Sequence, residues 1–154
     1  VQDRIVLLDF GATRVFGRGF IESYADIVGG AIDGDRARII EGAKAIGIMN
    51  AGFPATVLDA FSLMCEMIVE PFLGAGSPRV PAHLLTAKGE YRWGESDLPL
   101  RTSSVAARNA LSVHFKVPPR EIVFLHRRLA GVFIMLATLN AELDTRELLR
   151  EYLD

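Results

Sequence analysis

The sequence predicts a mainly helical fold that opens with a single short strand. Apolar residues recur at three- and four-residue steps along most of the 154 residues, which is typical of amphipathic helices. Residues 5–8 are instead a short continuous run of apolar residues followed directly by a turn, and this pattern indicates a buried strand. The length suits one domain or one lobe of a larger domain, so residues 1–154 are expected to form a single unit.

Two helices are expected after this strand. The first ends at the turn Asp33-Gly34-Asp35, and Asp35 or its neighbour can cap the second. Gly47 and the segment 50–52 then end the second helix. The apolar faces consist of Phe20, Tyr24, Ile27, Val28 and Ala31 in the first helix and of Ile39, Ile40, Ala43 and Ile46 in the second.

A third helix is predicted to begin at Pro54, which suits a first helical turn, and to stop at Glu70, because Pro71 disfavours helical geometry before it. Its polar stripe is narrow, so we expect this helix to be covered on most sides. The stripe consists of Asp59, Ser62, Glu66 and Glu70. In the loop beyond it, Tyr91 and Trp93 alternate with polar residues, which favours a short extended or hairpin segment anchored on the helices by its two rings.

A fourth helix is predicted over 101–115, and the pair Pro118-Pro119 separates it from a fifth. The fifth helix has the strongest helical periodicity in the chain. Its apolar stretch 129–139 is shorter than the about 20 residues that span a membrane, so it is expected to be a buried core helix. Gly131 inside this stretch predicts the close approach of a neighbouring element.

Charge and composition exclude several classes of protein. The chain has 17 basic and 19 acidic residues, and this balance lacks the positive field that nucleic-acid binding needs. With glycine counted in place of tyrosine, about 57% of the residues are apolar, which exceeds the usual share. Part of the surface is therefore expected to be covered by another body or to touch a membrane.

A single cysteine, Cys65, excludes an intrachain disulfide and a cysteine-rich zinc site, and it favours a reducing compartment. No targeting segment is recognised. The expected location is cytoplasmic, with peripheral contact to a membrane left open.

Most catalytic signatures are excluded by their context. Gly42 and Gly47 have the spacing of a phosphate-binding loop, but no Lys and no Ser or Thr follow them. Cys65 lies on an apolar helical face without a basic neighbour, which favours a packed thiol. The histidines also lack the helical His and Glu pairing of a zinc hydrolase. They are His83, His114 and His126.

The tripeptide Asp9-Phe10-Gly11 follows the apolar strand directly. In protein-kinase-like sites, a carboxylate at this place binds the magnesium that bridges nucleotide phosphates. The Phe packs into the core and the Gly allows a sharp turn. Asp9 is therefore a candidate metal ligand and the tripeptide a candidate nucleotide-binding element, although an Asp that merely starts a turn is an equal alternative on the motif alone.

Three segments of the chain resemble the UbiB/AarF atypical kinase-like family, whose members include proteins needed for ubiquinone synthesis. They read LLDFGA at 7–12 with the helix that follows, GDRARIIEGAKAIG at 34–47, and PREIVFLHRRLAGVF at 119–133. The resemblance implies the helical C-terminal lobe of a protein-kinase-like fold. It also implies that the intact protein binds Mg²⁺ and ATP, with Asp9 as magnesium ligand, and hydrolyses ATP or transfers its phosphoryl group in support of quinone or lipid metabolism.

The departures from the family pattern concern its catalytic groups. The catalytic Asp and second metal-binding Asn of the family lie upstream of the motif, and only eight residues precede Asp9. The phosphate-contacting Lys, its partner Glu, the Ala-rich loop and the Lys-x-Gly-Gln segment have no counterpart. We therefore expect a C-terminal lobe fragment of a larger kinase-like domain, with no catalytic residue of its own, inactive alone and partnered by the missing N-terminal lobe and ATP.

The alternative is a noncatalytic helical interaction or membrane-associated module, such as a pseudokinase lobe. His126, Arg127 and Arg128 bear on this choice. The favoured interpretation is that His126 borders the core while the arginines solvate the helix and shield its apolar length. The other is that the arginines meet lipid headgroups.

Overall fold

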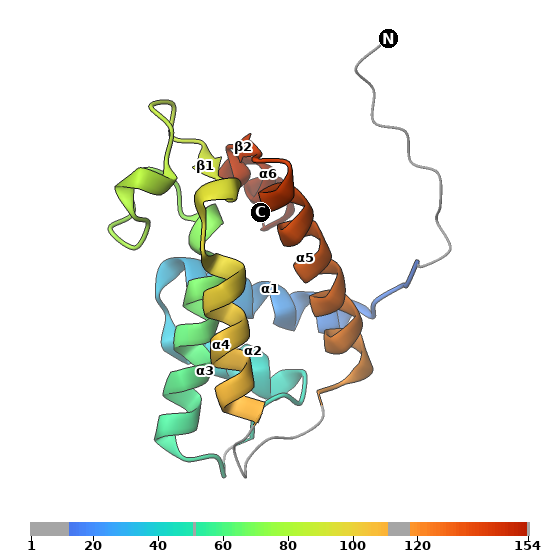
Figure 1. Cartoon of the computed structure of the whole chain (residues 1–154). Coiled ribbons are helices and arrows are strands. Elements are labelled where there is room, and N and C mark those ends of the chain that lie inside the picture. Colours follow the sequence, from blue (N-terminus) through green and yellow to red (C-terminus); the bar gives the residue numbers. More distant parts are fainter. Residues whose placement is uncertain (1–12, 51, 111–117, 154) are drawn as a thin grey trace.

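The computed structural model describes residues 13–50, 52–110 and 118–153, and it confirms a mainly helical fold (Figure 1). The predicted strand at 5–8 lies outside the described residues, as does the end of the fourth predicted helix. The α-helices are α1 (Arg18–Asp33), α2 (Arg36–Ala45), α3 (Ala55–Ile68), α4 (Leu98–Ala110), α5 (Arg120–Thr138) and α6 (Thr145–Leu153). The shorter elements are the 3-10 helices η1 (Glu70–Phe72), η2 (Ala82–Leu84) and η3 (Trp93–Glu95) and the strands β1 (Tyr91–Arg92) and β2 (Glu142–Leu143).

Helices α1 and α2 form the most closely packed pair. Gly34 adopts a left-handed conformation with φ of 73° between them, and the Asp35 carboxylate caps α2 by accepting a hydrogen bond from the Arg38 amide at 3.0 Å. Gly42 lies against the backbone of α1, because a Cβ at this position would be 2.7 Å from the Ser23 carbonyl oxygen. The turn, the cap and the close approach of the two helices follow from these residue types.

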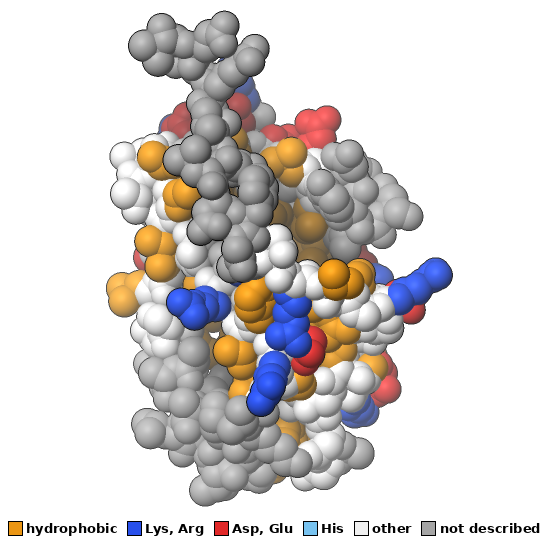
Figure 2. Space-filling model, turned by 90° about the vertical axis from the view of Figure 1, so that its right-hand side faces the viewer, with side chains coloured by type: hydrophobic (Ala, Val, Ile, Leu, Met, Phe, Trp, Pro, Cys, Tyr) orange, Lys and Arg blue, Asp and Glu red, His pale blue; other side chains and the backbone are white. Residues whose placement is uncertain are grey.

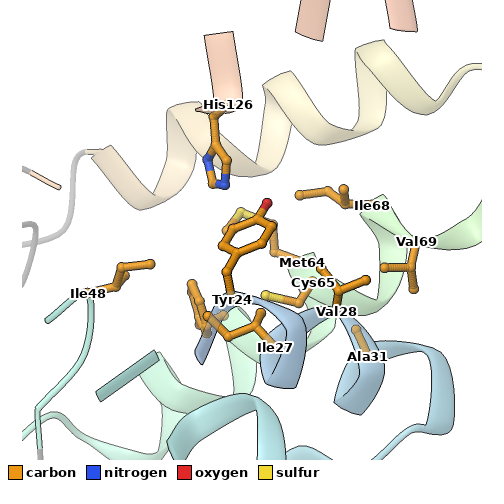
Figure 3. Close-up of a pocket in the computed structure, with 11 residues that line it drawn as sticks. Tyr24, Ile27, Val28, Ala31, Ile48, Met64, Cys65, Ile68, Val69 and His126 are labelled. Atoms are coloured by element: carbon orange, nitrogen blue, oxygen red, sulfur yellow. The ribbon is translucent and has the colours of Figure 1, made fainter. Parts of the chain in front are cut away.

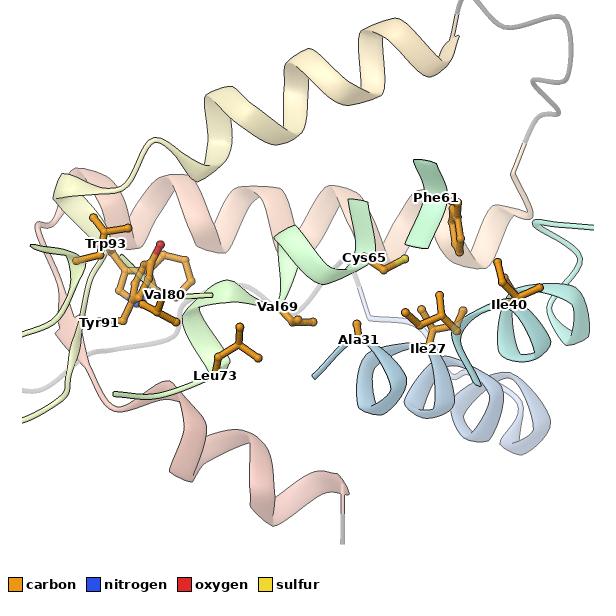
Figure 4. Packing of buried hydrophobic residues seen from close by; sticks show 13 residues of the cluster. Ile27, Ala31, Ile40, Phe61, Cys65, Val69, Leu73, Val80, Tyr91 and Trp93 are labelled. Carbon is orange, nitrogen blue, oxygen red and sulfur yellow. The ribbon is translucent and has the colours of Figure 1, made fainter. Parts of the chain in front are cut away.

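The hydrophobic core lies between this helix pair, α3 and the segment that follows α3. Figure 4 shows it extending from Ile27 and Ile40 at one end to Tyr91 and Trp93 at the other. Helix α3 contributes Phe61 and Cys65, both 8% exposed. The prediction of a polar stripe along α3 is wrong for two of its members, since Ser62 and Glu70 are buried. Ser62 is accommodated because its hydroxyl donates to the Leu58 carbonyl at 3.0 Å, one turn earlier.

The buried Glu70 carboxylate joins three parts of the fold. It accepts a hydrogen bond from the Tyr91 hydroxyl at 2.6 Å and two from Arg101 at 2.8 Å each. The Tyr91 hydroxyl also lies 2.7 Å from the Ser96 hydroxyl. Burial is the main cause that raises the pKa of Tyr91 above its usual value. These bonds fix η1, β1 and the start of α4 relative to one another, because a buried carboxylate is costly unless it is paired.

The segment around β1 confirms the extended geometry expected for it. Tyr91 forms a bridge with Leu85 across a tight turn and pairs with Leu143 of β2 in the short antiparallel sheet. Tyr91 and Trp93 are each 2% exposed, with ring centroids 5.3 Å apart. Their predicted role as rings that anchor the loop on the helices is confirmed, since Trp93 also meets Phe133 of α5 at 4.8 Å.

Helix α5 departs from the expectation of a buried core helix. Ile122 is its one buried residue, while Val132, Ile134 and Met135 are 45%, 58% and 53% exposed. Within the described part of the chain, no atom lies within 4 Å of a Cβ built at Gly131, so the predicted close approach there is wrong. The face on which α5 lies shows apolar side chains between basic ones (Figure 2). No helix of the described residues is long and apolar enough to cross a membrane.

Two glycines in helix interiors should respond oppositely to the same substitution. Alanine favours a helix over glycine by about 1 kcal/mol, so Gly131→Ala, which meets no atom, should stabilise the chain. Gly42→Ala should destabilise it by about 1 to 3 kcal/mol, because the added methyl group meets the Ser23 carbonyl of α1. Urea unfolding of the two variants measures both changes. A Gly42→Ala variant as stable as Gly131→Ala would contradict the close helix contact.

The Glu70 network can be tested by removing one hydroxyl group. Tyr91→Phe should lower the free energy of unfolding by about 1 to 2 kcal/mol, because Glu70 then loses a buried donor. Tyr24→Phe is the matched control, since the Tyr24 hydroxyl makes no hydrogen bond to a described residue, and it should change stability little. Equal losses in thermal unfolding for the two variants would show that the Glu70 contact does not stabilise the fold.

Candidate functional site

The candidate magnesium and nucleotide residues Asp9, Phe10 and Gly11 lie outside the described residues, so their roles stay predictions. The described chain begins just after them, with residues 13–17 in no regular secondary structure. Among the described residues, no group of three or more His, Cys, Asp or Glu side chains is placed to hold a metal ion.

The segment that follows the candidate motif is held on the first turns of α5. The Arg14 guanidinium lies 2.6 Å from the Glu121 carboxylate and 5.9 Å from the centre of the Phe124 ring. Phe16 stacks on Phe20 of α1 at 5.2 Å and meets Phe124 at 6.3 Å. Arg14 and Glu121 are 107 residues apart in the sequence, so no local sequence pattern predicts their ion pair.

A large apolar groove lies between α3, α4 and α5 and has a volume of about 730 Å³. It is also lined by Tyr24 of α1, by Pro118, and by Ile48, Met49 and Phe53 in the segment before α3. The α3 stripe of its wall consists of Thr56, Val57, Ala60, Phe61, Met64 and Ile68. The α5 stripe consists of Ile122, His126, Leu129, Ala130, Phe133 and Ile134. One turn of α4 adds Pro99, Thr102 and Ser103. We call this surface the α3–α5 groove.

Tyr24 of α1 and His126 of α5 face each other where this groove meets a smaller cavity of about 50 Å³. Their ring centroids are 6.1 Å apart with the planes inclined at 60°. Figure 3 shows the Tyr24 hydroxyl directed toward the His126 imidazole, among apolar side chains. Neither side chain makes a hydrogen bond to another described residue, and both line the groove.

Protonation states at this end of the groove are set by burial. Burial raises the pKa of Tyr24 to about 12 and that of Cys65 to about 12, and the charge of Glu66 adds to the Cys65 shift. Burial also shifts the pKa of His126, which it lowers because the charged imidazolium loses contact with water. His126 still has an exposed surface, and we attribute that exposure to the open groove that it lines.

These protonation states decide what the groove can do chemically. At neutral pH the phenol and the thiol are protonated and the imidazole is uncharged. Cys65 is therefore a packed thiol, as predicted, and not a nucleophile. The groove is lined mainly by apolar side chains and is suited to binding apolar surface.

Basic side chains lie along the outer side of α5. Arg127 and Arg128 are exposed, which agrees with their predicted role in solvating the helix. The Arg128 guanidinium lies 5.4 Å from the centre of the Phe124 ring. The alternative role, contact with lipid headgroups, stays a prediction.

No protein-family model matches the chain. It is 31% identical over 150 residues to "Atypical kinase coq-8, mitochondrial" of Caenorhabditis elegans, a match that covers 97% of this chain and 18% of that protein. It is 30% identical over 148 residues to "Atypical kinase COQ8B, mitochondrial" of Rattus norvegicus, covering 96% of this chain and 25% of that protein. The third relative, "Atypical kinase COQ8, mitochondrial" of Schizosaccharomyces pombe, is 28% identical over 155 residues.

The chain thus spans about a fifth to a quarter of the length of these relatives. Each match covers 96% or more of the chain, including the candidate motif and both walls of the groove. Over nearly its whole length the chain is homologous to a region of the COQ8 atypical kinases, and this confirms the resemblance to the UbiB-type family that its motifs predicted.

Proposed function

We propose that residues 1–154 are a C-terminal lobe unit of a kinase-like ATP-binding protein of the UbiB type. The observation that carries the proposal is the match of 97% of the chain to a protein named an atypical kinase. The mainly helical structure supports it, since such a lobe is expected to be helical. In the intact protein the activity would be ATP hydrolysis or phosphoryl transfer linked to quinone or lipid metabolism.

Asp9 is the residue proposed to bind Mg²⁺ in the intact protein. A hard divalent cation prefers oxygen ligands, and a carboxylate that directly follows a strand is held with little loss of entropy. Phe10 would pack beside it and Gly11 would allow the turn. When bound, Mg²⁺ neutralises charge on the nucleotide phosphates. The contacts of Arg14 with Glu121 and Phe124 support this role, because they fix the chain a few residues beyond the motif.

The compartment is also a proposal. The names of the three relatives call those proteins mitochondrial. For this chain the single cysteine favours a reducing compartment, and the sequence-based expectation is cytoplasmic with peripheral contact to a membrane.

A noncatalytic interaction module is the second candidate. The exposed apolar residues of α5 and the open α3–α5 groove favour it, since monomeric proteins seldom expose large apolar surfaces without a partner. The two candidates are compatible if the partner is another part of the same protein.

The 154-residue chain alone should not bind Mg²⁺ and ATP tightly. Phosphoryl transfer requires the catalytic base, the phosphate-binding lysine and the metal ligands together, and this chain supplies only a candidate ligand. Calorimetric titration with ATP and Mg²⁺ should show no stoichiometric binding in the micromolar range. Tight binding at one nucleotide per chain would defeat the proposal that the rest of the nucleotide site lies elsewhere.

In the full-length protein, Asp9→Asn should lower ATP hydrolysis by about 100-fold or more, because an amide is a far poorer magnesium ligand than a carboxylate. Phosphate release measures the activity, and thermal unfolding shows whether the variant folds. Asp33→Asn is the control, since this carboxylate is exposed and, among the described residues, pairs with Arg38 alone at 3.4 Å. Retained turnover in a folded Asp9→Asn protein would remove Asp9 from the role.

A further inference from the structure

The walls of the α3–α5 groove have matching lengths. The α3 stripe runs from Thr56 to Ile68 and the α5 stripe from Ile122 to Ile134, so each spans twelve helical steps. At 1.5 Å per residue, each wall is about 18 Å long. One turn of α4 lines the space between these two walls, and the natural complement of the part left open is a further helix of about the same length as the walls.

The groove is open rather than enclosed. His126 and Ala130 are exposed although both lie on its wall, and Ile134 is 58% exposed. A small ligand is usually buried over most of its surface in its pocket, which an open trough of this length does not provide. A helix has a diameter of about 10 Å with its side chains and can fill such a trough while keeping its outer face in water.

Helix α5 is attached to the rest of the molecule near both of its ends. Phe133 meets Trp93 at 4.8 Å and Phe72 at 6.5 Å, and α5 contacts η3 more extensively than it contacts α4. Farther toward the N-terminus, Ile122 is the one buried residue. Apolar surface is costly to expose to water, so covering both walls would stabilise this arrangement.

The polar groups in the groove restrict the occupant further. The Tyr24 hydroxyl and the uncharged His126 imidazole make no hydrogen bond to a described residue. An occupant that buries them must supply a hydrogen-bonding group at this level, because a buried polar group without a partner is costly. A helix with one Asn, Gln, Ser or Thr side chain on its apolar face meets this requirement.

We propose that the α3–α5 groove is the docking site for an amphipathic helix of about three turns that comes from the same full-length polypeptide, outside residues 1–154. The inference rests on the proposed function for the statement that the chain is one unit of a larger protein. At least three quarters of each of the three relatives lie outside the match, so chain is available to supply the helix. Covalent linkage also gives a helix of the same chain a high effective concentration.

Site-specific photocrosslinking in the full-length protein tests this docking site. The photoreactive residue p-benzoylphenylalanine is placed at Ala130, which is exposed and lies in the α5 stripe. The matched control places it at Val132, which is 45% exposed on the same helix but does not line the groove. We expect crosslinks within one polypeptide from position 130 to a helical segment outside residues 1–154, and none to that segment from position 132.

Other crosslinking results would overturn the proposal. They are a crosslink from position 130 to a second copy, which doubles the mass on a denaturing gel, a crosslink to lipid, equal crosslinking from both positions, or no crosslink. The measurement needs neither nucleotide nor Mg²⁺. Failure of this docking site is therefore distinguishable from failure of Asp9 as the magnesium ligand.

A pair of charge substitutions gives an independent test. Ala130→Glu and Val132→Glu should both leave the melting temperature of the 154-residue chain nearly unchanged, because both positions are exposed in it. In the full-length protein, Ala130→Glu should lower the melting temperature by several degrees, since the docked helix would bury the carboxylate, whereas Val132→Glu should not. Equal melting temperatures for the two full-length variants would contradict the docked helix.

Discussion

The close contact between α1 and α2 is the constraint on which the rest of the structure depends. With glycine at position 42, the α2 backbone can lie directly against the carbonyl of Ser23. At this separation three side chains of the pair are exposed by 5% or less: Ile27 and Ala31 of α1 and Ile39 of α2. They belong to the core against which α3 packs. Because protein interiors are close-packed, a larger distance between α1 and α2 would shift α3 and with it one wall of the groove.

The two walls of the groove are therefore fixed with different strength. The α3 wall packs against the α1 and α2 pair. In addition, Glu70, just after α3, binds Arg101 of α4. The α5 wall depends on the rings around Phe133 at one end and on the pairing of Arg14 with Glu121 at the other. Between these ends, α5 has apolar side chains that are about half exposed, among them Val132 and Ile134.

Local signals predicted the elements well and their environments less well. The cap at Asp35 and the start of α3 after Pro54 depend on neighbours in the sequence, and the structure has both. Burial depends on partners far along the chain, so periodicity could show that α5 has an apolar face but not that this face is uncovered. For the same reason the local pattern predicts Glu70 in a polar stripe, whereas the structure buries it with Tyr91 and Arg101, which are 21 and 31 residues away.

The candidate site could be predicted only as a motif, since Asp9 is recognised by the residues beside it, whereas the other groups of the proposed site have no recognised counterpart in the sequence. The apolar excess of the composition has a counterpart in the exposed side chains of α5. Helix α5 has the composition of a core helix and the exposure of a surface helix, and the arginines beside it cover little of the groove wall because they lie on its outer side. Exposing apolar side chains of this kind to water is costly, which agrees with the proposal that the chain is one unit of a larger protein.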